Sequence, residues 1–254
     1  MIFTNLIQAN LKTRILGHTI EYYPFTESTN EDVWELVEEG ESPEGMLVLT
    51  DDQRNGKGRR ENEWHSSPGK NLTFSLLVKP EFTLEQMGLV SLLAGVSVCE
   101  GIQKFCRLSC TLKWPNDIII NGRKTGGTLI ENKEIGEKPF LCVGVGLNVN
   151  ETSDQFPPGI SRTATSLFAE LGHSVQREPL LAEILNCFEL YYPENMGKVK
   201  LRWLQLCDHS GRKVEFRYGQ EKITGVFKGI NQNGYAEIEV DGQERIYSGG
   251  VIEL

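Results

Sequence analysis

The stretch "TLKWPNDIIINGRKTGGTLIEN", residues 111–132, predicts the centre of the fold. Apolar, β-forming residues lie on both sides of Asn121-Gly122, a pair typical of two-residue hairpin turns, so two antiparallel strands are expected here. Pro115 indicates a corner before the hairpin, because its ring fixes the backbone for a turn. The sequence therefore predicts a strand, a corner and a hairpin in immediate succession.

Charged side chains are placed at defined points of this hairpin. Lys113 ends the first strand, and Asn116 and Asp117 follow at the corner, where side chain–backbone hydrogen bonds are common. Lys124 lies seven residues after Asp117, so the two side chains could meet across the hairpin as an ion pair. In a cleft, such a lysine would bind a carboxylate or a phosphate. An ordinary hairpin with a surface lysine explains the same pattern, and both interpretations stay open.

Strands and helices alternate on both sides of this centre, and a run of short strands ends the chain. Ser28 followed by Glu31 indicates a capping box at the start of a helix that Gly40 ends. We expect strands at 20–25, 45–50, 71–80 and 140–150, and helices at 84–106, 164–172, 179–192 and 197–207. From about residue 209 the pattern changes to short, Gly-bounded alternating runs, which are typical of a small β-barrel.

Composition limits the kinds of protein that fit. The 254 residues carry a net charge of −9 and a sequence pI of about 5.1, which argues against a general nucleic-acid binder. We find no continuous apolar run of the ~18 residues that a membrane span needs, and no secretory signal. The six cysteines form no CxxC pair and read as reduced, mostly buried thiols, so we expect a cytoplasmic protein without a structural metal site.

A basic loop stands out against this acidic background. In "QRNGKGRRENEW", residues 53–64, glycines alternate with cations. Glycines let the backbone approach a ligand and turn N–H groups toward an anion, while arginines offer paired donors to phosphate or carboxylate. The loop is not a Walker A motif, because GxxxxGK[ST] is absent. A solvated, mobile basic loop is the equally simple alternative.

Two further motifs are weak when each is taken alone. "GVGLNVN", residues 144–150, ends an apolar strand with glycines that permit close approach of a ligand, or of a neighbouring strand. "STN", residues 28–30, is most simply a helix cap, although its hydroxyl groups could also bind a polar ring at the helix N-terminus.

The order of these motifs carries more information than any one of them. From about Glu27 to the end, "ESTNE", the basic loop, "KWPND", "GVGLNVN" and the β-rich tail resemble the biotin protein ligase family. The resemblance implies an α+β fold, with a mixed β-sheet flanked by helices over 1–207 and an SH3-like β-barrel over 208–254. It also implies a form without DNA-binding function, since no residues here could form the winged helix-turn-helix of the larger members.

The resemblance further implies an activity. Such enzymes join biotin to ATP, giving biotinyl-5′-AMP, and then pass the biotinyl group to one lysine of a carrier domain of a biotin-dependent carboxylase. ATP, Mg²⁺ and biotin are the implied small molecules, and the protein would be a monomer or a homodimer without nucleic-acid or membrane partners. The implied biotin-binding residues are Ser28, Thr29, Asn30, Gln53, Gly56, Gly58, Lys124, Gly127, Gly144 and Gly146; those for ATP are Lys57, Arg59, Arg60, Trp64 and Asn148; and the catalytic residues are Arg59, Lys124 and Asp117.

The loop departs from the pattern usual in the family, GRGRRGRKW. Lys57 replaces an arginine, and Glu61, Asn62 and Glu63 replace a glycine and two cations. These changes lower the positive charge of the loop. Two rival functions therefore stay open: a degenerate biotin-binding module that no longer ligates, and a lipoate–protein ligase, which shares the catalytic fold. Asp117 is either the base of the second step or a partner that only orients Lys124.

Overall fold

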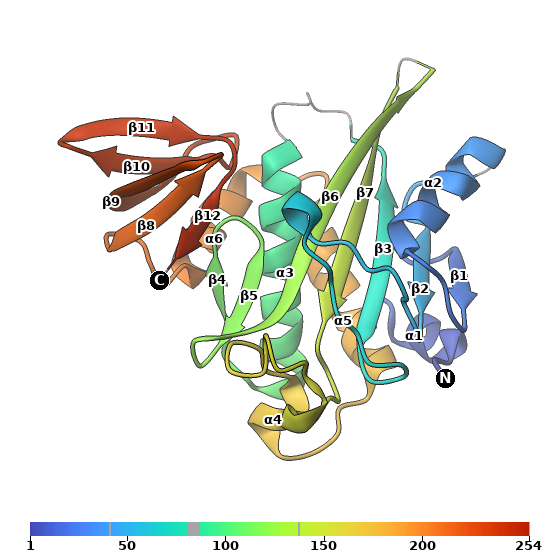
Figure 1. The fold of residues 1–254 in the computed structure, drawn as a ribbon. Coiled ribbons are helices and arrows are strands. Elements are labelled where there is room, and N and C mark those ends of the chain that lie inside the picture. Colours follow the sequence, from blue (N-terminus) through green and yellow to red (C-terminus); the bar gives the residue numbers. More distant parts are fainter. Residues whose placement is uncertain (41, 81–86, 137, 254) are drawn as a thin grey trace.

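The computed structural model describes residues 1–40, 42–80, 87–136 and 138–253. The core of the protein is a seven-stranded mixed sheet (Figure 1). The strand order is β1-β2-β3-β7-β6-β5-β4; β1 and β2 are parallel and the other neighbours are antiparallel. The strands are β1 (Ile20–Tyr23), β2 (Leu47–Thr50), β3 (Leu72–Val78), β4 (Thr111–Lys113), β5 (Asp117–Ile120), β6 (Arg123–Ile135) and β7 (Lys138–Leu147).

The hairpin predicted at the centre of the sequence is confirmed. Asn121 and Gly122 both have positive φ, 49° and 75°, as a tight hairpin turn requires. β6 is longer than its partner β5 and continues along β7 to Ile135. The apolar strands predicted at 71–80 and 140–150 lie side by side in the middle of the sheet as β3 and β7.

Helices cover the two faces of the sheet differently. The helices are α1 (Thr4–Asn10), α2 (Thr29–Glu39), α3 (Met87–Cys106), α4 (Leu167–Leu171), α5 (Arg177–Glu189) and α6 (Val199–Leu206). α3 packs against α5 and α6 on one face, and α2 packs against β2, β3 and β7 (Figure 1). α1 was not predicted from the sequence, and residues 84–86 of the helix predicted over 84–106 lie outside the described residues.

α3 corrects one expectation from the sequence. This helix is long and apolar enough to span a membrane, with a mean hydropathy of 1.4, whereas we expected no such segment. Glycines, two serines and Glu100 interrupt its apolar side chains, so no continuous apolar run marks it. In the folded chain 67% of the apolar window is buried, against α5, α6 and the sheet. Its apolar character is therefore that of a core helix.

A five-stranded antiparallel sheet, in the order β11-β10-β9-β8-β12, forms the C-terminal part. Its strands are β8 (Lys213–Tyr218), β9 (Glu221–Ile230), β10 (Ala236–Val240), β11 (Gln243–Tyr247) and β12 (Val251–Glu253). Trp114 joins it to the main sheet: the indole Nε1 donates a hydrogen bond of 3.1 Å to the backbone oxygen of Gly234, and the ring lies 6.0 Å from that of Phe216. The boundary between 207 and 208 stays a prediction.

The capping box predicted at the start of α2 is absent. Ser28 is the N-cap residue, but its side chain makes no capping hydrogen bond. Glu31 forms an ion pair with Lys57 of the basic loop instead of returning to the helix end. Gly40 ends the helix in a left-handed conformation, as predicted. Ser28 is 3% exposed and belongs to the pocket described below, so its hydroxyl group is available there.

Four buried thiols and one buried imidazole belong to the interior of the protein. All six cysteines are free, and four of them are buried, as predicted. His209 is fully buried where α6 meets the C-terminal sheet, and its ring lies 4.5 Å from that of Phe227. Burial lowers the pKa of His209 to about 4, although neighbouring Asp208 acts in the opposite direction. The imidazole is therefore neutral in the folded protein at neutral pH.

This imidazole predicts an acid dependence of stability. In the unfolded chain the pKa of His209 returns to about 6.5, so as the pH falls from 6.5 toward 4 the unfolded state binds a proton that the folded state excludes. The free energy of unfolding should drop by ~1–3 kcal/mol over that range. Urea unfolding at a series of pH values measures this, and the His209→Phe variant should show a shallower dependence between pH 6.5 and 5. An unchanged dependence would contradict this role for His209.

Candidate active site

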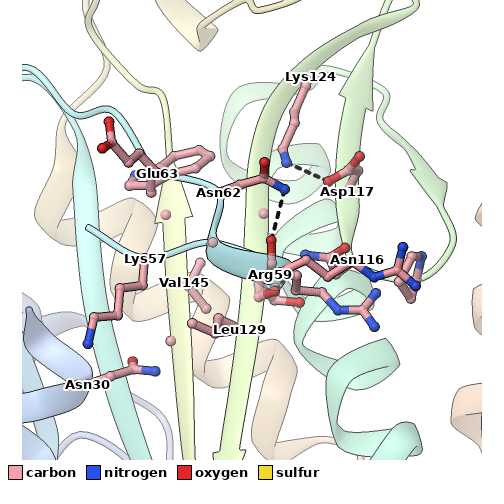
Figure 2. A pocket seen from close by; sticks show the side chains of 18 of the residues that line it. Asn30, Lys57, Arg59, Asn62, Glu63, Asn116, Asp117, Lys124, Leu129 and Val145 are labelled. Atoms are coloured by element: carbon pink, nitrogen blue, oxygen red, sulfur yellow. Dashed lines mark hydrogen bonds and ion pairs between the residues drawn. The ribbon is translucent and has the colours of Figure 1, made fainter. Parts of the chain in front are cut away.

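A pocket opens on the face of the sheet opposite α3, beneath the basic loop (Figure 2). Its walls come from the start of α2, the loop, the corner before β5, strands β6 and β7, and the beginning of β12. Its volume is about 170 Å³. The predicted residues that line it are Ser28, Thr29, Asn30, Gln53, Lys57, Gly58, Arg59, Arg60, Trp64, Asp117, Lys124, Gly127, Gly144 and Gly146.

The floor of the pocket is a buried polar network. Gln53 Oε1 accepts a 3.0 Å hydrogen bond from the backbone N–H of Thr29, whose hydroxyl lies 2.7 Å from Ser75 Oγ. Ser75 donates in turn to Asn30 Oδ1 at 2.6 Å. The Asn30 Nδ2 group is buried without a partner among the described residues. A free buried donor in a pocket is costly unless a ligand accepts from it, so this floor suits a polar ligand with an acceptor group.

Two lysines enclose one carboxylate at the corner before β5. Lys124 Nζ lies 2.6 Å from Asp117 Oδ1 (Figure 2). Lys113 Nζ lies 3.4 Å from Asp117 Oδ2. The ion pair between Lys124 and Asp117 that the sequence allowed is therefore confirmed. Asn116 fixes the corner, since its Nδ2 donates to the backbone oxygen of Thr128 on β6. The three charged groups leave a net positive charge at this wall of the pocket.

The loop adds two arginines from the opposite side. Gly58 precedes a short 3₁₀ turn in which Arg60 has a φ of 55°, a conformation that is unfavourable for a residue other than glycine. Asn62 stabilises the turn by donating from Nδ2 to the backbone oxygen of Arg59 at 2.9 Å (Figure 2). Burial and the nearby Arg60 lower the pKa of Arg59, whereas Asp117 raises it. The Arg59 guanidinium remains charged at neutral pH, because the ordinary pKa of arginine lies far above neutrality.

Lys57 lies differently from its predicted role. Its ammonium group forms an ion pair with Glu31 on α2, on the side of the loop away from Lys124 (Figure 2). To contact ATP, as predicted, this side chain would have to leave Glu31. Both partners are about half exposed, and such pairs contribute little to stability, so the exchange would cost little.

Trp64 and two glycines hold the loop against the sheet. The indole of Trp64 packs directly on Gly146, where any Cβ atom would collide with it, and the ring centre is 5.8 Å from Lys124 Nζ. Gly56 does not line the pocket; a Cβ atom there would lie 2.6 Å from the backbone oxygen of Trp64. The structure thus assigns Gly56 and Gly146 to close packing with the loop itself. The contact of Trp64 with adenine stays a prediction.

Asn148 is a second predicted residue that does not line the pocket. It is 5% exposed, and its Nδ2 donates to the backbone oxygen of Thr165 at 3.1 Å. Its Oδ1 is buried without a partner among the described residues. In this structure Asn148 holds the segment before α4 against the end of β7, and its contact with adenosine stays a prediction.

Other pocket residues were not predicted. Thr73 of β3 lines the pocket, and Ser75, two residues further along the same face of that strand, supports Asn30 of the floor. The spacing of two between these hydroxyl residues is the only signal in the sequence that could have indicated them. The segment Gly250–Ile252 reaches the pocket from the C-terminal sheet, and nothing in the local sequence signals this. Glu63 lines the pocket, while the side chain of Glu61 lies outside what the structure describes.

Comparisons with known proteins agree with this site. The model of the "Biotin/lipoate A/B protein ligase family" matches residues 22–150, and that of the "Biotin protein ligase C terminal domain" matches 209–254. The chain is 34% identical over 251 residues to "Bifunctional ligase/repressor BirA" of Bacillus subtilis, covering 96% of this chain and 77% of that protein. It is 27% identical to "Biotin--[acetyl-CoA-carboxylase] ligase" of Mycobacterium tuberculosis, covering 96% and 94%.

A solved structure gives the same result for the fold. "Biotin protein ligase from Aquifex aeolicus in complex with biotin and ATP" superposes with a TM-score of 0.77 at 26% identity, covering 93% of this chain and 98% of that one. The C-terminal sheet is thus the SH3-like part of a biotin ligase fold, as predicted. The chain belongs to the biotin protein ligase family.

Proposed function

We propose that this protein is an ATP-dependent biotin–protein ligase with its active site in the pocket under the basic loop. The observation that carries the proposal is the arrangement of Lys124, Lys113 and Arg59 around one opening above a buried polar floor. Such a site suits one ligand with a polar ring and a carboxylate, and a second ligand with phosphates. Biotin and ATP have these groups.

In the first step, a biotin carboxylate oxygen attacks the α-phosphorus of ATP. A P–O bond forms, the bond to the β-phosphate oxygen breaks, and pyrophosphate leaves with its electron pair. Lys124 and Arg59 stabilise the negative charge that builds at the reacting oxygens, and donors of this kind are typically worth ~10²–10³ in rate. Thr29, Asn30 and Gln53 hold the ureido ring in the polar floor.

Mg²⁺ fits this site as part of the nucleotide. The described residues contain no group of three metal-ligating side chains, and Asp117 is paired with two lysines. Magnesium commonly enters enzymes on substrate phosphates, with few protein ligands. It would neutralise phosphate charge there, while the lysines and arginines of this chain hold the remaining oxygens.

In the second step, the amine of an acceptor lysine attacks the carbonyl carbon of biotinyl-5′-AMP. An amide bond forms, the bond between the carbonyl carbon and the phosphate oxygen breaks, AMP leaves with its electron pair, and the amine releases its proton to solvent. We propose that Asp117 orients Lys124 rather than acting as the base, because ion pairs occupy both of its oxygens. The names of relatives that act on acetyl-CoA carboxylase support a carrier domain of that enzyme as the acceptor.

Two rival functions have less support. The match of 209–254 to a biotin protein ligase C-terminal domain favours biotin over lipoate. The retained Lys124–Asp117 pair and Arg59 disfavour a degenerate binding module. The net charge of −9 supports the proposal that nucleic acid is not a partner, and six free thiols support a reducing, cytoplasmic location.

A transfer assay tests the function directly. The purified protein is incubated with Mg·ATP, a carrier domain of acetyl-CoA carboxylase, and either biotin or lipoate, and the carrier is analysed by mass spectrometry. We expect one biotinyl group on one lysine and no transfer of lipoate. Transfer of lipoate would assign the rival ligase activity, and biotin binding without transfer would assign the degenerate module.

Replacing Arg59 should release the intermediate. Arg59 comes from the loop and lines the pocket, and its Nη2 atom lies 3.5 Å from the Cβ position of Gly249, so its side chain reaches from the loop to the C-terminal part. In Arg59→Gly, biotinyl-5′-AMP should escape and label lysines of bystander proteins such as serum albumin. We expect bystander labelling to rise at least ~10-fold relative to wild type. Streptavidin blotting measures it, and an unchanged level would rule out retention by Arg59.

A further inference from the structure

An irregularity in β6 determines where Lys124 points. Side chains alternate between the two faces of a strand, and Gly127 and Leu129 line the pocket. In a regular strand Lys124, three residues before Gly127, would therefore face the opposite side. The pairing with β5 shifts at this point: Gly126 is opposite Ile118, but Lys124, not Thr125, is opposite Ile119.

This shift is a β-bulge with Thr125 as the extra residue. It brings Lys124 to the same face as Gly127, whose Cβ position would lie 3.4 Å from Lys124 Nζ, and so to Asp117. The ion pair at the active site thus depends on a bulge. A bulge leaves backbone groups without ladder partners, so something else must bind them if Lys124 is to stay in place.

The segment before α4 supplies those partners. Lys124 N–H donates to the backbone oxygen of Thr163 at 2.7 Å, and Thr165 N–H donates to the backbone oxygen of Lys124 at 2.9 Å. On the other side, Asn148 N–H donates to the backbone oxygen of Thr125 at 2.8 Å. Residues 163–165 therefore run along the bulge as a short additional strand, which we call the strap.

One buried carboxylate fastens the strap to the hairpin. Glu170, in α4, has a side chain only 5% exposed. Its Oε1 accepts from Arg123 Nη2 at 2.7 Å and from the Thr165 hydroxyl, and its Oε2 accepts from Asn121 Nδ2 at 2.6 Å. These donors lie on both sides of Lys124: two belong to the hairpin and one to the strap. Glu170 does not line the pocket.

We propose that Glu170 is a positioning residue of the ligase: through the strap it holds the β6 bulge that aims Lys124 at the reacting oxygens. The proposal rests on the function proposed above. A buried carboxylate with three donors, one of them charged, is held rigidly, and charge-assisted hydrogen bonds of this kind are about twice as strong as neutral ones. Glutamine in its place would turn an amide N–H₂ group toward at least one of these donors.

A double-mutant cycle tests this coupling. Biotin-dependent exchange of labelled pyrophosphate into ATP is measured for wild type, Glu170→Gln, Lys124→Gln and the double variant. We expect Glu170→Gln to lower kcat at least ~10-fold while KM for biotin and for ATP changes less than ~3-fold, because the ligands do not touch Glu170. In the Lys124→Gln background, Glu170→Gln should lower kcat by less than a further ~2-fold, because the lysine that Glu170 positions is gone.

Two further variants separate positioning from folding. Glu100→Gln removes a carboxylate on α3 that is 13% exposed and is bound by Arg202 and Tyr191. It should lower stability while kcat stays within ~2-fold of wild type. Thr165→Val keeps the shape of the strap and removes one donor to Glu170, and it replaces Glu170→Gln in the cycle if that variant does not fold.

Two results would contradict the positioning role of Glu170, and a third would contradict the proposed function itself. Equal losses of kcat in the wild-type and Lys124→Gln backgrounds, or a wild-type kcat in Glu170→Gln and Thr165→Val, would overturn the positioning role. Absence of biotin-dependent exchange in the wild-type protein would instead contradict the proposed function.

Discussion

The Lys124→Gln variant should form biotinyl-5′-AMP ~10²–10³-fold more slowly than wild type. In the proposed mechanism Lys124 stabilises the charge that builds at the reacting oxygens, and Asp117 holds its ammonium group at 2.6 Å. Glutamine keeps most of the side-chain volume but removes the charge, so the loss falls on the transition state. Single-turnover formation of radiolabelled adenylate measures the rate.

The control for this variant is Lys133→Gln. Lys133 lies on the same strand, pairs with exposed Glu38 and lies 5.2 Å from the ring of Trp34, outside the pocket. Its replacement should leave the rate within ~2-fold of wild type, as is usual for exposed ion pairs. A near wild-type rate in Lys124→Gln would remove this lysine from the mechanism.

The Gly144→Ala variant should bind biotin on the order of 10²-fold more weakly. A methyl group at Gly144 would collide with the carboxamide of Asn30, which Ser75 holds from behind at 2.6 Å. Because β7 is a central strand with fixed partners on both sides, Asn30 must move. In the proposed binding mode, this displacement would put Asn30 into the space for the ureido ring. Titration calorimetry with biotin measures the affinity.

Gly159→Ala is the matched control, because the same methyl group there would meet no atom within 4 Å. Its affinity for biotin should equal that of wild type. If Gly144→Ala is folded by circular dichroism and binds biotin as tightly as wild type, the polar floor is not the place where biotin binds.

The order of the elements followed from sequence because local chemistry specified it. Asn121-Gly122 imposed the hairpin, and apolar runs without charges indicated the central strands β3 and β7. α1 was missed because its short helix has no charged residue in its first or last turn and no capping side chain. Its position depends on contacts with α5, which are far away in the sequence.

The candidate site was predictable where a motif is local and not where long-range packing decides. "KWPND" with Lys124 indicated an ion pair, and the structure confirms it. The strap and Glu170, the roles of Trp64 and Gly146 in packing the loop, and the contribution of Gly250 all depend on contacts between distant segments. The ion pair of Lys57 with Glu31 shows the converse: a basic residue in a binding motif can be paired outside the pocket.

The central claim is that this pocket activates biotin with ATP, and isotope exchange tests it most directly. The wild-type protein is incubated with Mg·ATP and labelled pyrophosphate, with and without biotin, and label in ATP is counted. Label should enter ATP only when biotin is present. Labelled pyrophosphate becomes part of ATP only by reacting with biotinyl-5′-AMP in the reverse of the first step, and this adenylate cannot form without biotin. Label that stays in pyrophosphate with saturating biotin, or exchange that does not need biotin, would contradict the account.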